Sequence, residues 1–190
     1  MPNYPFNGQP IEFIGNNLFK FLGRKIKFNL SESEQINIIQ QNFDRDMKKV
    51  DQEPINGFMK LWLYQNYVIA FLSWPFMVYD LNLSLAKHLE AKANKYLKKW
   101  AGIPRSANTS ILYRDRCNKG IHLTSISLHY KKMQVLKAHT AKHSKDSDIR
   151  AVYDRIRSSD AEKIRVWKPS KELEKLESIV HFDKKYANII

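Results

Sequence analysis

The chain has 190 residues, of which 43% are hydrophobic and 12% aromatic, a composition that indicates a folded protein and excludes a disordered tail. Its formal net charge of +13 indicates an acidic partner, most commonly a nucleic acid or an anionic membrane surface. The single cysteine, Cys117, excludes both a disulfide framework and a cysteine-based zinc knuckle.

The first 30 residues predict a small β-hairpin. Two apolar and aromatic runs, "PIEFIG" at 10–15 and "FKFLGRKIKF" at 19–28, are separated by "NN" and punctuated by Gly15 and Gly23. Short runs bounded by turn residues are typical of strands. The first ten residues have neither a basic region nor an apolar core of the secretory kind, so we expect an intracellular protein of the nucleus or cytoplasm.

From about residue 31 onward the apolar residues recur at helical spacing, and no later segment has the pattern of a strand. Ser31 with Glu34 makes a capping box, Ser84 and Thr124 are expected to cap later helices, and Pro75 is expected to end an aromatic helix. Helices are expected over residues 31–52, 57–73, 84–101, 109–114, 124–142, 147–157 and 170–186. The predicted fold class is therefore mainly α, a helical bundle preceded by a small N-terminal β-hairpin.

One segment raises the question of a membrane span. Residues 61–79 contain no charge over 19 positions, close to the ~20 residues that cross a bilayer. Polar residues and Pro75 interrupt the segment, and its aromatic residues run throughout instead of gathering at the two ends. We interpret it as a buried core helix and expect no membrane partner.

The positive charge is concentrated in one part of the chain. Residues 87–145 hold 14 lysines and arginines against two acids, Glu90 and Asp115, a surplus of 12. The rest of the chain is nearly balanced, with 18 basic and 17 acidic residues. A partner with a negatively charged backbone is therefore expected to contact this central block.

The sequence contains no pattern that supports catalysis or a metal site. Asp44 and Asp46 are two apart, so on a helix they point about 200° apart and cannot share an ion. His139 and His143 have the better spacing, but no acidic or cysteine ligand accompanies them. Cys117 has no neighbouring catalytic signature, and the glycines are too scattered to cradle a phosphate.

The central block is the one candidate site. Four aromatic residues accompany its cations, but Tyr96, Trp100, Tyr113 and Tyr130 fall on the apolar side of the helices and are better explained as packing. The lysines lie off that side, so we expect contacts to the phosphate backbone with little readout of base sequence. The candidate binding residues are Lys95, Lys98, Lys99, Arg105, Arg114, Lys131 and Lys132.

Four motifs, in this order, resemble the C-terminal part of the reverse transcriptases of LINE-like retrotransposons, which lack long terminal repeats. They are "FKFLGRKI" at 19–26, "KLWLYQNYVIAFLSWPFMVYDL" at 60–81, "YLKKWAGIPRS" at 96–106 and "IHLTSISLHYKK" at 121–132. The similarity spans roughly residues 10–182, and "VWKPSKELEKLES" at 166–178 adds a weaker match.

The resemblance implies a division of the chain into three parts. Residues 1–30 would be the palm-end hairpin, 31–145 a helical thumb-like domain and 146–190 a C-terminal helical extension. Within the hairpin, Phe21, Leu22 and Gly23 would occupy the primer-grip position. The thumb would hold RNA or an RNA:DNA duplex by its backbone.

The resemblance also implies an activity that this chain lacks by itself. In the family, RNA-directed DNA polymerisation needs an adjacent pair of aspartates that hold Mg²⁺, and no two aspartates are adjacent here. We therefore expect no catalytic residue, no metal ligand and no cofactor in this chain, and a separate palm and fingers portion as a further partner. The alternatives are a stand-alone basic nucleic-acid-binding module and a non-functional relic of a retroelement.

Overall fold

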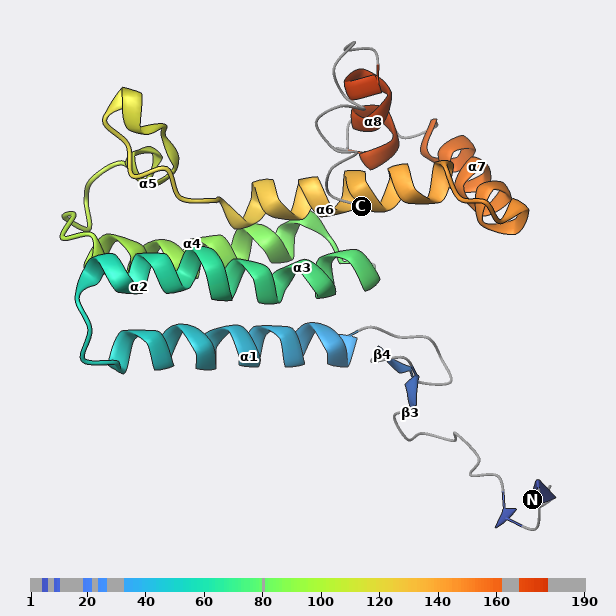
Figure 1. Cartoon of the computed structure of the whole chain (residues 1–190), viewed down its shortest axis with the longest axis horizontal. Coiled ribbons are helices and arrows are strands. Elements are labelled where there is room, and N and C mark those ends of the chain that lie inside the picture. Colours follow the sequence, from blue (N-terminus) through green and yellow to red (C-terminus); the bar gives the residue numbers. More distant parts are fainter. Residues whose placement is uncertain are drawn as a thin grey trace.

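The computed structural model describes residues 5–6, 9–10, 19–21, 24–26, 33–79, 81–161 and 168–177 (Figure 1). The chain is mainly helical, which confirms the predicted fold class. The helical elements in chain order are α1 (Ser33–Gln52), α2 (Gly57–Leu63), the π turn η1 (Tyr64–Val68), α3 (Ile69–Val78), α4 (Leu83–Trp100), α5 (Ser110–Tyr113), the 3-10 turn η2 (Arg116–Asn118), α6 (Ile126–Lys142), α7 (Ser147–Ala161) and α8 (Pro169–Glu177).

Two short antiparallel strand pairs precede the helices. Strand β1 (Pro5–Phe6) pairs with β2 (Gln9–Pro10), and β3 (Phe19–Phe21) pairs with β4 (Arg24–Ile26). Of the expected primer-grip residues, Phe21 is the last residue of β3, whereas Leu22 and Gly23 lie outside the described residues. The hairpin over residues 1–30 therefore stays a prediction.

The helices pack in layers around one core. Because α2, η1 and α3 follow one another without a break, they form a single continuous rod, which we call the α2–α3 rod (Figure 1). The rod packs against α1, α4 and α6, and α4 also contacts both α1 and α6 directly. The fully buried side chains Phe43, Tyr64, Leu72, Phe76 and Leu89 come from α1, the rod and α4.

A second, smaller cluster joins the C-terminal helices to α6. Val135 of α6, Tyr153 of α7 and Leu173 of α8 are buried against one another. The same helix thus serves both clusters, with its N-terminal half facing the main core and its C-terminal half facing α7 and α8. The boundary expected at residue 145 follows α6, but the packing continues across it.

Pro75 does not end the aromatic helix, contrary to the prediction. It lies buried inside α3, which continues to Val78. A proline inside a helix removes one hydrogen bond, at a cost of ~3 kcal/mol. Tertiary packing offsets this cost, because Phe76 contacts the ring of Tyr130 edge-on and its carbonyl accepts a hydrogen bond from Gln134 at 2.5 Å.

The predicted caps of two helices are also shifted. Asn82, not Ser84, caps α4, because its side-chain oxygen accepts a hydrogen bond from the Leu85 amide at 2.9 Å. Ser125, not Thr124, caps α6 through the Leu128 amide. Thr124 instead bonds the rod, where its amide donates to Gln65 at 2.8 Å. Ser31 of the predicted capping box lies outside the described residues.

The rod is buried on only one side, which corrects the interpretation of residues 61–79 as a buried core helix. Leu61, Tyr64, Val68 and Leu72 face the core, while the aromatic residues between them remain exposed. Among the helices that the structure describes, none is long and apolar enough to cross a bilayer.

Candidate nucleic-acid interface

Helix α4 carries the candidate cations on its polar side. Its apolar stripe is buried against the core, including Leu89, Leu97 and Trp100, so the lysines between these residues point away from the core. Lys95 is exposed on the outer side of the helix, and its side chain has no partner within the described residues. It is therefore available to contact a phosphate.

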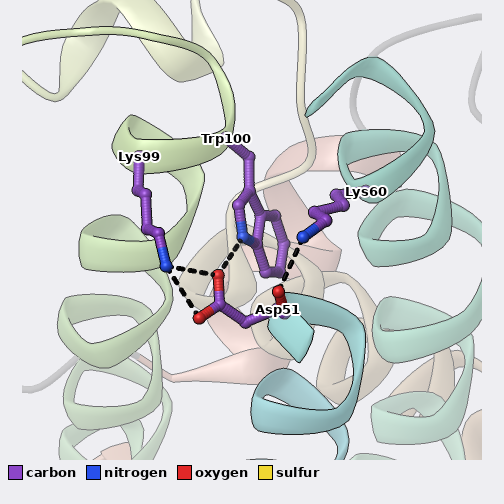
Figure 2. A network of polar contacts seen from close by, with 4 residues as sticks. All are labelled: Asp51, Lys60, Lys99 and Trp100. Carbon is purple, nitrogen blue, oxygen red and sulfur yellow. Dashed lines mark hydrogen bonds and ion pairs between the residues drawn. The ribbon is translucent and has the colours of Figure 1, made fainter. Parts of the chain in front are cut away.

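Lys99, one of the predicted binding residues, is paired with an acid of the chain. Its ammonium donates to both carboxylate oxygens of Asp51 at 2.9 Å, and the same carboxylate accepts the indole N–H of Trp100 at 2.8 Å (Figure 2). These hydrogen bonds, first that of Lys99 and then that of Trp100, lower the pKa of Asp51 below its ordinary value. The protein's own carboxylate thus neutralises one predicted binding residue.

The network around Asp51 joins three helices at one end of the bundle. Besides the two α4 side chains, Lys60 of α2 donates to the Asp51 backbone carbonyl at 2.6 Å, which satisfies a carbonyl in the last turn of α1 (Figure 2). One helical heptad earlier, Lys92 pairs with Asp44 at 2.6 Å. From the Asp44–Lys92 pair to the Asp51–Lys99 pair, the residue number rises by seven on both helices. Helices α1 and α4 therefore run parallel.

Lys98 is also occupied, because it holds the turn that follows α4. Its ammonium donates to the carbonyls of Arg105 and Ala107 at 2.9 and 2.5 Å. Gly102 has a φ of 67°, the left-handed conformation that ends helices and that glycine adopts without strain. The turn therefore stops α4 where the sequence predicted, and it leaves the exposed side chain of Arg105 without a partner in the described part of the chain.

The α5 loop carries further cations and is anchored to α4. The Tyr113 hydroxyl donates to Asn94 at 2.5 Å, so the loop is anchored to the α4 residue that precedes Lys95. Arg114 follows directly and is exposed. Gly120 lets the loop close on itself, because a Cβ there would lie 1.9 Å from the Arg114 carbonyl oxygen.

Two exposed cations of this loop were missing from the sequence prediction. Arg116 begins η2, and Lys119 ends it in a left-handed conformation with φ 59°. The "CNKG" turn is the signal that could have placed them on an exposed tip, because Asn and Gly favour such conformations. We name the exposed cations around the end of α4 and the α5 loop the α4–α5 basic cluster: Lys95, Arg105, Arg114, Arg116 and Lys119.

The two lysines predicted on α6, Lys131 and Lys132, point in different directions. Lys131 and Lys132 are adjacent, and adjacent residues of a helix point about 100° apart. Lys131 is half-buried and Lys132 is exposed. The structure therefore separates them from one another and does not bring them into the α4–α5 basic cluster through any contact it shows.

Ser73 and His129 form a pair with the elements of a nucleophile and a base. The Ser73 hydroxyl and the His129 Nε2 atom are 2.8 Å apart, where the rod meets α6. Burial, with a smaller effect of Lys132, lowers the pKa of His129 to about 4. Within the described residues no carboxylate bonds the other ring nitrogen, and no group of three metal-ligating side chains occurs. We assign this pair to packing.

Comparison with known proteins adds no assignment. No family model matches the chain, and no curated protein is similar to it.

Proposed function

We propose that this chain binds nucleic-acid duplexes through their phosphate backbone, as the palm-end and thumb part of a reverse transcriptase of the LINE-like class. The observation that carries the proposal is the α4–α5 basic cluster. Its five cations are exposed and have no side-chain partner in the described part of the chain, while nearby Lys92 and Lys99 are paired with acids. Unpaired cations that gather on one part of a surface are a typical footprint of phosphate binding.

The chemistry favours contact with the backbone over recognition of base sequence. Lys95 is a point charge on a rigid helix, and Arg105 and Arg114 present planar donors from short turns anchored to that helix. Such groups position a duplex by its phosphates and carry little sequence information. The proposal is therefore of binding without polymerisation, in keeping with the lack of adjacent aspartates in the chain.

A labelled RNA:DNA hybrid of 20 base pairs, titrated with the full chain at several salt concentrations, tests the proposal. Five phosphate contacts, one for each cation of the α4–α5 basic cluster, predict a loss of affinity on the order of 500-fold between 50 and 200 mM salt. A triple variant with Lys95→Gln, Arg105→Gln and Arg114→Gln should lower the slope of log K against log salt by about 3.

The matched control removes the same charge elsewhere. Lys48 and Lys49 of α1 and Lys171 of α8 are exposed, and Lys→Gln at all three gives the same net charge as the test variant. This control should keep the wild-type slope. Equal losses in both variants, or binding that does not depend on salt, would overturn the proposal.

The relic alternative makes a different prediction about folding. A degenerate product should unfold gradually, whereas the continuous core between α1, the rod, α4 and α6 predicts one cooperative transition. A cooperative transition together with no duplex binding would reject both the relic and the proposed function. A stand-alone binding module would share the duplex binding and differ only in ancestry.

A further inference from the structure

The α2–α3 rod exposes an apolar face along its whole length. At least one large apolar side chain per turn is exposed, and the aromatic ones keep 38–70% of their surface in contact with solvent. These side chains, which we name the aromatic face, are Phe58, Met59, Trp62, Tyr67, Phe71 and Trp74. Exposed apolar patches of this extent are rare on monomers and mark interaction sites.

The chemistry of this face argues against the duplex of the proposed function as its partner. The rod has no charged residue between Leu61 and Val78, and its one lysine, Lys60, is bound to the Asp51 carbonyl. The basic surplus lies in residues 87–145, outside the rod. A phosphate backbone on the aromatic face would lose water without gaining an ion pair, whereas another apolar surface would lose only unfavourable hydration.

The area of the face is more than half of what one side of a dimer needs. With about 200 Å² for each aromatic side chain, the exposed parts of its five aromatic residues amount to roughly 500 Å². A standard interface buries roughly 800 Å² on each partner, of which the centre is enriched in aromatic residues. The aromatic face would thus supply more than half of a stable interface.

We propose that the chain forms a two-fold symmetric dimer in which the aromatic face packs antiparallel against the same face of a second copy. A straight rod with one apolar side complements itself under a two-fold rotation perpendicular to its axis, and two-fold dimers are the commonest oligomers. Because the face is uncharged, two copies meet there without like charges in contact. None of the residues of the α4–α5 basic cluster belongs to the rod.

Sedimentation equilibrium of the full chain without nucleic acid tests the dimer. The wild type should sediment with twice the mass of one chain at micromolar concentration. Trp62→Glu or Trp74→Glu should weaken the dimer by on the order of 1000-fold, because a central aromatic residue is worth roughly 30-fold and each substitution occurs twice in the dimer.

The control is Leu128→Glu, on α6 and outside the rod, where the leucine is 64% exposed. It should leave the dimer unchanged, and circular dichroism should show the same helix content in all variants. A monomeric wild type overturns the proposal. A dimer that survives both tryptophan substitutions also overturns it. If a monomeric Trp74→Glu variant still binds the duplex, the proposed function does not depend on the dimer.

Discussion

The Asp51 carboxylate, at the end of α1, accepts hydrogen bonds from the Lys99 ammonium through both of its oxygens, at 2.9 Å each. The shorter bond, at 2.8 Å, comes from the indole of Trp100, which is only 7% exposed. One carboxylate therefore neutralises a lysine that was expected to bind nucleic acid and satisfies a tryptophan that belongs to the core. The Asp51 side chain therefore engages Lys99 in a contact within the fold, and Lys99 is not left free for a partner.

Asp51→Ala should destabilise the fold by about 1–3 kcal/mol, because the largely buried Trp100 indole loses its acceptor. Since its partners lower the pKa of Asp51 below the ordinary 3.8, this stabilisation is present at neutral pH and is lost as the pH falls below 3.8. Asp44→Ala is the matched control, because it removes the equivalent but exposed pair with Lys92 and should cost at most about 0.5 kcal/mol. Urea denaturation measures both variants, and equal losses would contradict the assignment.

Duplex binding should distinguish the paired lysine of α4 from the free one. Lys95→Ala should lower the salt slope by about 0.9, the value for one lost phosphate contact. Lys99→Ala should leave the slope unchanged, because the Lys99 ammonium is already paired with Asp51. Both variants carry the same net charge, so fluorescence anisotropy against the same hybrid compares them directly. If Lys99→Ala lowers the salt slope more than Lys95→Ala does, Lys99 contacts the duplex after all and the assignment is wrong.

Stability should fall as the pH is lowered from 6.5 toward 4 because of His129. Burial lowers the pKa of this side chain from 6.5 to about 4, so in this range the unfolded chain binds a proton that the folded chain does not. His129→Gln should remove this part of the pH dependence. His88→Gln, at an exposed position of α4, is the control and should unfold with the wild-type dependence. Urea midpoints at pH 7, 6 and 5 measure the difference.

Gly57→Ala should destabilise the fold by about 3 kcal/mol, because the added Cβ would lie 1.9 Å from the Trp100 carbonyl oxygen and force α2 away from α4. Gly102→Ala, in contrast, meets no atom within 4 Å and costs only the strain of its left-handed conformation, about 1 kcal/mol. Thermal denaturation of the two variants compares close packing with backbone strain. A smaller loss at Gly57 than at Gly102 would contradict the packing of α2 on α4.

Local patterns predicted the helices well, because the apolar repeat of a helix and the residues that end it are both local in the sequence. The helix of α4 ends at the predicted turn, where Gly102 takes the left-handed conformation that it adopts without strain. The caps moved by one or two residues, from Ser84 to Asn82 and from Thr124 to Ser125, because neighbouring polar residues compete for the same role.

Periodicity could not show which apolar sides have neighbours. The uncharged segment 61–79 was interpreted as a buried core helix, because polar residues and Pro75 interrupt it and its aromatic residues do not gather at its ends. Helices α1, α4 and α6 cover only one of its sides, and Trp62 and Trp74 remain exposed. For a similar reason, Pro75 did not end the helix. The α6 residues that hold the next residue, Phe76, lie more than 50 positions away in the chain, so the local sequence could not show them.

The amino-acid sequence by itself determined where the helices lie and that the surplus of positive charge falls in residues 87–145, because both follow from the order of residues along the chain. Only the tertiary structure decided which cations are free. Lys95 and Lys99 are the same residue type one helical turn apart, yet Lys99 meets Asp51 of α1 and Lys95 meets solvent. A charge is available for a partner only if folding has not already supplied one, and that depends on segments distant in the chain.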